Sequence, residues 1–166
     1  MATLTPKTKK FDTKTSVAKA RRLSKAPKKW VLRSNGQNYS WSNKMERIEV
    51  IRLGIPFTAI EALSEKLNRP IKFILSQVGI PQTTYNKKKN EAALLDSGTA
   101  ELLVLLTELI DHGQDVFNGE DEKFQRWLTK PNLSLGGVTP ESLFDTATGI
   151  EEVNACLNRI EYGILA

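Results

Sequence analysis

Cysteine and histidine each occur only once in this sequence, as Cys156 and His112. A single cysteine excludes an intramolecular disulfide framework, and one distant Cys/His pair offers no metal-ligand spacing. No uninterrupted apolar run approaches the roughly 20 residues that a membrane-spanning helix needs, and the N-terminus lacks the apolar segment of a secretory signal. We therefore expect no metal, no membrane association and a reducing interior such as cytoplasm.

The sequence also lacks the patterns on which common active sites depend. It has no glycine-rich phosphate loop, no Ser/His or Cys/His pair with further partners, and its carboxylates are scattered over several helix faces. These absences exclude the usual nucleophilic and acid–base arrangements. We therefore expect a binding protein that has no catalysis of its own and needs no cofactor.

Acidic residues are nearly missing from the first part of the chain. Residues 1–45 hold 12 Lys/Arg against Asp12 alone, a net charge of +11, whereas residues 46–95 carry +3 and residues 96–166 carry −9, which sum to the overall +5. A basic N-terminal part and an acidic C-terminal part favour two different partners. The partner of the basic part is expected to be an anionic polymer. An organellar transit peptide is the second interpretation of this front, which shows no amphipathic helical period.

Residues 1–43 predict a basic, flexible arm, because few large apolar residues are available to offset the entropy of ordering. Within it, Asn35-Gly36 lies between short apolar runs and is typical of a two-residue hairpin turn. Alternatively, Trp30, Tyr39 and Trp41 hold this stretch against the folded part. The densest basic cluster, a candidate DNA contact, is Arg21, Arg22, Lys25, Lys28 and Lys29.

From Lys44 onward the apolar residues recur at helical spacing, which predicts an all-α fold. Glycine, asparagine and proline divide this part into short helices over 44–54, 56–68, 70–79 and 81–95, followed by a long helix over 97–119. Near the end, we expect one helix that starts at Pro140 and stops at Gly149, and a last helix over 150–163.

Residues 70–95 have the spacing of a helix-turn-helix. Leu75 lies on the first helix, Gly79 at the turn, Ile80 after it, and Tyr85 on the inward side of the second helix. The outward positions carry side chains of the kinds that contact base edges or phosphates in protein–DNA complexes. The candidate DNA-binding residues are Gln82, Thr83, Thr84, Asn86, Lys87, Lys88, Lys89 and Asn90. A solvated basic helix face is the alternative interpretation.

The long helix has an apolar stripe that is wider than one packing face requires. The extra width indicates either a core position or a dimer surface, and reading a palindromic operator favours a two-fold dimer. The candidate dimerisation residues are Leu102, Leu105, Leu106 and Leu109.

Four motifs of fixed spacing follow. They are aromatic-x-x-Trp-Leu-x-x-Pro-Asn-x-x-Leu-Gly-Gly from Phe124, Thr-Pro-x-x-Leu-x-Asp-Thr from Thr139, Gly-x-x-x-Val from Gly149, and Leu-x-Arg-Ile-x-Tyr-Gly from Leu157. Through them the chain resembles the C-terminal toxin-binding domain of Xre-type antitoxins, the group also named after MbcA and ParS. Including the preceding helices, the resemblance covers about Glu46 to Leu165, and the long basic front departs from it.

The resemblance implies a homodimeric antitoxin of a type II toxin–antitoxin pair in bacterial cytoplasm. Such a protein neutralises an NAD-consuming RES-domain toxin by occupying its active-site entrance, and it represses the shared operon by binding double-stranded operator DNA. By resemblance, the toxin-facing residues are Arg159, Glu161, Tyr162, Gly163, Ile164 and Leu165. The alternative is a stand-alone helix-turn-helix regulator whose C-terminal domain only mediates dimerisation.

The expected organisation follows from both lines of reasoning. An arm over 1–43 precedes a helix-turn-helix DNA-binding and dimerisation domain over 44–98, a connecting helix over 99–118, and a small helical toxin-binding domain over 119–166. Within the last domain, Trp127, Pro131, Asn132, Leu135 and Gly136 are assigned mainly to domain structure.

Overall fold

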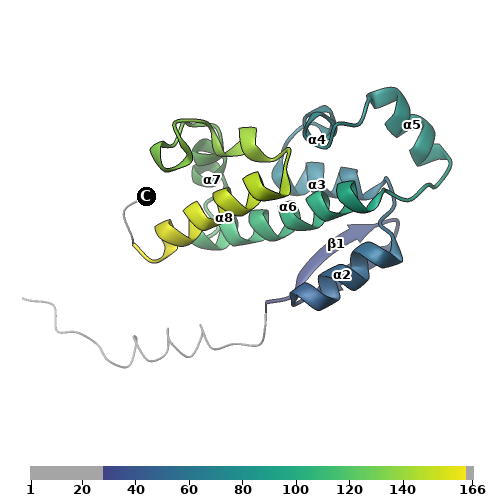
Figure 1. The fold of residues 1–166 in the computed structure, drawn as a ribbon, viewed down its shortest axis with the longest axis horizontal. Helices are drawn as coiled ribbons and strands as arrows, with labels where there is room; N and C mark the ends of the chain where they lie inside the picture. The colour runs from purple at the N-terminus through teal and green to yellow at the C-terminus, as the bar shows by residue number, and fades with distance from the viewer. Residues whose placement is uncertain (1–27, 164–166) are drawn as a thin grey trace, which may run out of the picture.

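The computed structural model describes residues 28–163 of the chain. Its strands are β1 (Trp30–Ser34) and β2 (Gln37–Trp41), and its helices are α2 (Lys44–Leu53), α3 (Ala59–Leu67), α4 (Ile71–Gln77), α5 (Gln82–Asn90), α6 (Ser97–Val116), α7 (Asp121–Leu128) and α8 (Ala147–Glu161). Two short 3-10 helices, η1 (Leu133–Leu135) and η2 (Pro140–Leu143), lie between α7 and α8 (Figure 1).

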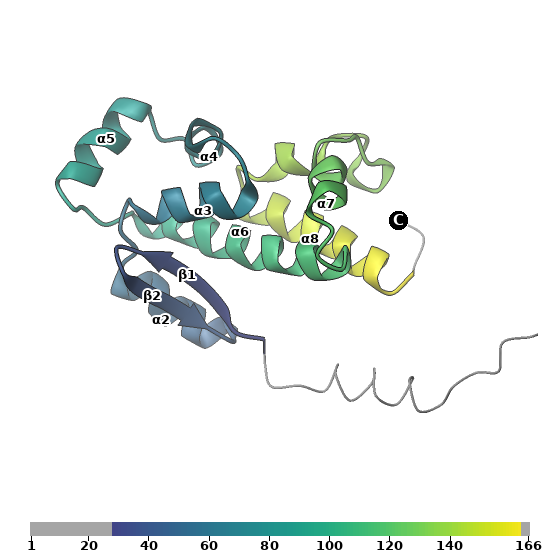
Figure 2. The ribbon, with the colours of Figure 1, turned by 180° about the vertical axis from the view of Figure 1, so that it is seen from behind.

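Helix α6 is the central element of the fold. Helix α8 runs along it, while α2, α3 and the hairpin strand β1 pack around it (Figures 1 and 2). Leu103, Val104 and Leu106 are fully buried in this arrangement. The wide apolar stripe of the long helix therefore serves the core of a single chain, because neighbours cover the helix on several sides.

This arrangement corrects the predicted dimer surface. Leu105, Leu106 and Leu109 are buried within the chain, and Leu102 is half-buried and packs against the core. Leu105, Leu106 and Leu109 therefore offer almost no apolar area to a second copy, and Leu102 alone of the four keeps part of its surface in solvent.

The prediction of an all-α fold is wrong, because residues 30–41 form a two-stranded antiparallel sheet. Asn35 and Gly36 adopt φ angles of +50° and +73°, as the predicted two-residue turn requires, and the register pairs Trp30 with Trp41. The prediction of a flexible arm over 1–43 is wrong for the hairpin residues. The first 27 residues of that arm lie outside the described part of the chain.

The hairpin is stable because its tryptophans pack on α6. The rings of Trp30 and Trp41 stack with their centroids 6.5 Å apart, and Trp41 is fully buried. The indole Nε1 of Trp41 donates to Glu108 Oε1 of α6 at 2.6 Å, which satisfies the one polar atom of the ring. An isolated hairpin is marginal in water, so this docking decides its formation.

Most of the predicted helices are present with shifted ends. Helix α2 stops at Gly54 and α3 at Asn68, as predicted, and Asn68 has a left-handed φ of +52°. Helix α5 ends at Asn90, earlier than predicted, because Leu95 N donates to Ile55 O and draws the chain back. Gly149 does not stop a helix: it lies in the first turn of α8, which Thr146 caps.

Candidate functional site

Helices α4 and α5 meet at the predicted turn. Gly79 has φ +70°, a left-handed conformation that glycine adopts without strain, and Ile80 N donates to Leu75 O at 2.9 Å. Tyr85 is buried, as predicted, with its ring 6.4 Å from that of Phe57. One aromatic side chain thus anchors α5 to the body and leaves its other faces in solvent.

The candidate DNA-binding residues lie together on the outer faces of α5. Gln82, Thr83, Thr84, Asn86, Lys87 and Asn90 are exposed, and Lys88 and Lys89 are half-buried. Gln82 donates to the side chain of Asn86 at 3.0 Å, which orients two amide groups on one face. The mean hydropathy of α5 is low, so an apolar partner does not fit this face, whereas a polar one does.

The three lysines of α5 differ in their surroundings. Lys89 forms an ion pair of 2.5 Å with Glu61 of α3, and Lys88 lies 3.3 Å from Glu91. The Lys89 hydrogen bond is the main reason that the pKa of Glu61 is lowered. Lys87 is largely exposed, and its 4.0 Å distance from the Glu91 carboxylate is the longest of these three contacts. It is therefore the lysine that is freest to bind an external anion.

Tyr85 and Glu61 also interact at the base of α5. Burial, and secondarily the Glu61 carboxylate beside it, raises the pKa of the Tyr85 phenol, which therefore stays neutral. The Tyr85 hydroxyl has no hydrogen-bond partner among the described residues, so the packing of its ring is what attaches α5 here.

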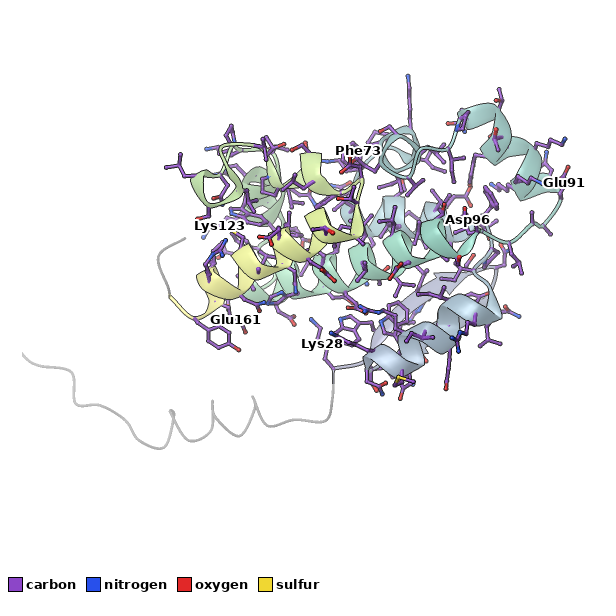
Figure 3. All side chains as sticks on the ribbon, in the orientation of Figure 1. Lys28, Phe73, Glu91, Asp96, Lys123 and Glu161 are labelled. Atoms are coloured by element: carbon purple, nitrogen blue, oxygen red, sulfur yellow. The ribbon has the colours of Figure 1, made fainter. Side chains whose placement is uncertain are left out.

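The basic cluster of the front is only partly described. Arg21, Arg22 and Lys25 lie outside the described residues, whereas Lys28 pairs with Asp115 of α6 at 2.5 Å. Lys29 is exposed. Lys28 thus contacts an acid near the C-terminal end of α6, away from α5 (Figure 3).

An aromatic cluster holds α7 against the end of α6. Phe117, Phe124 and Trp127 lie with ring centroids 5.6 to 6.3 Å apart, and Phe124 is fully buried. Gly113 of α6 allows this contact, because a Cβ at that position would collide with the Phe124 ring. The prediction that Trp127 serves domain structure agrees with this packing.

The loop between α7 and α8 is built around Asn132. Its side-chain oxygen accepts from Ser134 N at 2.8 Å, its amide group contacts Cys156 Sγ at 3.4 Å, and its backbone pairs with Val138. Gly136 and Gly137 both have positive φ and close the turn. The loop is therefore fixed to α8, which supports the structural assignment of Asn132 and Gly136.

This rigid loop presents a residue that the sequence prediction missed. Leu133 is 93% exposed, and Val138, across the loop, is also exposed. The apolar pattern gave no reason to single out Leu133, because leucines in a helical protein are usually core. The position of Leu133 between Pro-Asn and Gly-Gly could have indicated its exposure, because such a tight turn is too small to bury every side chain.

The candidate toxin-facing residues lie at the end of α8. Tyr162 is 73% exposed, Glu161 and Gly163 are exposed, and Arg159 is half-buried with no hydrogen-bond partner for its Nε among the described residues. Ile164 and Leu165 lie outside the described residues. The exposed phenol of Tyr162 is the largest apolar surface that the described end of α8 presents.

His112 lies at the contact between α6 and the end of α8. Its Nδ1 lies 2.7 Å from Asn154 Oδ1 and its Nε2 lies 3.2 Å from Glu161 Oε2, so it joins α6 to the end of α8. Glu161 is consequently held in place on one side.

The two candidate regions lie at opposite ends of the molecule. Helix α5 and Glu91 lie at one end of α6, and Lys123 and Glu161 lie at the other (Figures 1 and 3). Between them, Arg69 bonds Glu141 at 2.9 Å and Gln125 donates to Leu67 O at 2.9 Å. The two candidate regions are therefore separated by the length of α6 (Figure 1).

Among residues 28–163, no group of acidic, histidine and cysteine side chains is arranged to hold a metal ion. In the same part of the chain, every helix is too short or too polar to cross a membrane.

Comparison with known proteins gives several matches. A family model described as the antitoxin Xre/MbcA/ParS C-terminal toxin-binding domain matches residues 112–163. A protein of Photorhabdus laumondii named Antitoxin Xre is 28% identical over 117 residues, which are 70% of this chain and 79% of that protein. The Antitoxin Xre of Yersinia enterocolitica is 25% identical over 119 residues, 72% and 80% of the two chains.

A third relative is the Prs ADP-ribosylating antitoxin of a Sphingobium species, 27% identical over 133 residues, 75% of this chain and 84% of that protein. The matched segment begins at His112 and contains both the aromatic cluster and the end of α8. The family model and these relatives show that the chain is similar to Xre-type antitoxins, and the similarity to their toxin-binding domain covers residues 112–163.

Proposed function

We propose that this antitoxin neutralises an NAD-consuming RES-domain toxin by direct binding and represses the shared operon as a homodimer on operator DNA. It has no catalytic activity of its own and acts in the bacterial cytoplasm. The observation that carries the proposal is the separation of two differently built surfaces: a polar and basic helix at one end and exposed apolar residues at the other.

The toxin surface consists of the end of α8 together with the loop after α7. Leu133 and Tyr162 are large, exposed and mounted on backbone that hydrogen bonds hold in place, as anchors of a protein interface are. The charged groups Glu161 and Arg159 beside them form a polar rim. Rigid anchors favour binding, because little side-chain freedom is lost on association.

The DNA surface is α5, with Thr83 and Asn86 as base-reading groups and Lys87 as the phosphate contact. These side chains are exposed, and the amide of Asn86 is oriented by Gln82. Asn makes bidentate contacts to adenine, and the methyl group of Thr meets that of thymine. The net charge of +5 favours approach to DNA.

The experiment that tests the proposal is co-expression of the intact chain with the product of its neighbouring gene, followed by co-purification and an NAD-consumption assay. We expect a stable complex that consumes no NAD. When the antitoxin is removed by denaturation and the toxin is refolded alone, we expect the toxin to consume NAD. A neighbouring protein that binds but never consumes NAD contradicts the RES assignment. No complex at all favours a stand-alone regulator.

A further inference from the structure

Helix α2 carries an exposed stripe that the fold of one chain does not use. At 3.6 residues per turn, Met45, Ile48, Glu49, Arg52 and Leu53 fall within an arc of roughly 140°. Met45 is 68% and Leu53 77% exposed, and the other three are exposed as well. Three large apolar side chains thus stand in solvent beside one acid and one base.

The opposite face of α2 accounts for its attachment to the protein. Val50 is buried there, Arg47 pairs with Glu108 of α6 at 3.2 Å, and Asn43 caps the first turn by accepting from Glu46 N. The stripe therefore stands on a helix whose position is fixed by its inner side, and substitutions along the stripe leave those inner contacts in place.

The apolar part of the stripe continues beyond the end of α2. Leu94, which is 57% exposed, lies against Gly54, so closely that a Cβ at Gly54 would collide with the leucine. Leu53 and Leu94 therefore lie side by side. Four of the seven exposed large hydrophobic residues of the described chain, namely Met45, Ile48, Leu53 and Leu94, belong to this one surface.

The charges on the stripe are self-complementary. Neither Glu49 nor Arg52 takes part in an ion pair among residues 28–163. When two copies of α2 pack antiparallel about a two-fold axis between positions 50 and 51, each position i faces position 101 − i. Glu49 then lies opposite Arg52 of the second copy, and this contact occurs twice, while Ile48 and Leu53 lie at the two edges of the same surface.

We propose that this stripe is the surface through which two copies of the chain associate, by antiparallel packing of α2 on α2. The inference rests on the proposed homodimer and supplies a larger exposed apolar surface than α6 does, since Leu105, Leu106 and Leu109 of α6 are buried and Leu102 is half-buried. In the same register, Met45 of one copy extends past the end of α2 of the second copy, toward the Leu94 of that second copy. The stripe lies apart from both α5 and the end of α8, so a dimer leaves both candidate sites uncovered (Figure 1).

The test is a charge exchange, read by sedimentation equilibrium of the full chain over a range of concentrations. Glu49→Lys and Arg52→Glu each place like charges opposite one another twice in the dimer, and we expect each to raise the dimer Kd by about tenfold or more. The double variant E49K/R52E restores both pairs with reversed sign, and we expect its Kd to return to near the wild-type value.

A matched pair of leucine variants tests the apolar part. Leu53→Ser is expected to weaken the dimer, whereas Leu133→Ser, which removes a still more exposed leucine from the loop after α7, leaves the dimer Kd unchanged. Circular dichroism checks that every variant keeps its helix content.

Three results overturn the inference: a wild-type chain that stays monomeric at all concentrations, a dimer that is insensitive to both single charge reversals, or a double variant no better than the singles. Toxin binding is measured on the same preparations. A dimer insensitive to these changes with toxin binding intact rejects the surface alone, whereas absence of toxin binding in the wild type rejects the proposed function.

Discussion

Asp96 is the residue whose local role is defined most closely. It caps the N-terminus of α6: its carboxylate accepts from Thr99 N at 3.0 Å and from the Thr99 hydroxyl at 2.7 Å. These bonds lower the pKa of Asp96 below its ordinary value of 3.8, chiefly through the backbone N–H of Thr99. Because α2, α3, α7, α8 and β1 all pack against α6, fraying of its first turn affects much of the core.

We therefore expect Asp96→Ala to lower the free energy of unfolding by about 1 kcal/mol at neutral pH, measured by urea denaturation followed by circular dichroism. A folded-state pKa below the unfolded value gives stability that is complete above about pH 3.8 and declines as the pH falls toward the folded value. The advantage of the wild type over the variant should thus shrink in acid. Asp145→Ala, at an exposed position, is the control, and equal losses for both variants would refute the capping role.

At the scale of elements, α5 combines two kinds of lysine on one helix. Lys89 is paired with Glu61 of α3 at 2.5 Å, while the largely exposed Lys87 makes only a long contact of 4.0 Å with Glu91. A close ion pair must be broken before its lysine can neutralise a phosphate, whereas a loosely paired, exposed lysine has less to lose. Adjacent residues of the same type therefore have different roles.

We expect Lys87→Ala to weaken binding to every DNA sequence and to reduce the salt slope of log K by about 1, measured by fluorescence anisotropy at several salt concentrations. Lys89→Ala is the matched control: it should chiefly loosen the α3–α5 contact and lower the thermal midpoint, with a smaller change in salt slope. Identical slopes for the two variants would show that the Glu61 pair does not distinguish them.

The hairpin shows how an element depends on its surroundings. The Asn35-Gly36 turn is a strong local signal, yet the strands have only each other as hydrogen-bonded neighbours. Trp41 stabilises them by burying its ring and donating to Glu108, a residue 67 positions later. A local pattern thus predicts the turn, while a distant helix decides whether the strands form.

At the scale of the whole molecule, the two candidate sites are separated by the length of α6 and are expected to be separable by mutation. Leu133→Ser should weaken toxin binding by about tenfold or more, because it removes an exposed apolar anchor, and should leave operator binding unchanged. The double variant T83A/N86A should do the reverse. Co-purification with the toxin and anisotropy on operator DNA measure the two effects.

Leu53→Ser is the matched control for toxin binding, since Leu53 is also highly exposed but lies on α2. If Leu53→Ser and Leu133→Ser weaken toxin binding equally, the loop after α7 is not a specific anchor. If T83A/N86A abolishes toxin binding as well, the two ends are coupled rather than independent.

Much of the protein was predictable because the signals are local. Helix spacing, the Asn35-Gly36 turn, the stop at Asn68 and the inward position of Tyr85 follow from short-range geometry. The motifs from Phe124 onward indicated the antitoxin family, because many residue types at fixed spacings are rarely matched by chance. The different pairing of Lys87 and Lys89 was not predictable from the sequence. Lys89 pairs with Glu61 on α3, and Lys87 makes only a long contact with Glu91 at the end of α5.

The sequence by itself determined the helices, the turns, the charge asymmetry and the resemblance to Xre-type antitoxins, because each depends on residues that are neighbours in the chain. Only the tertiary structure decided which leucines face solvent. An apolar stripe looks the same in a core and in an interface, since both bury the same surface. The packing of α8, α2 and α3 around α6 buried Leu106 and left Leu53 and Leu133 exposed, and so separated core from candidate contact surface.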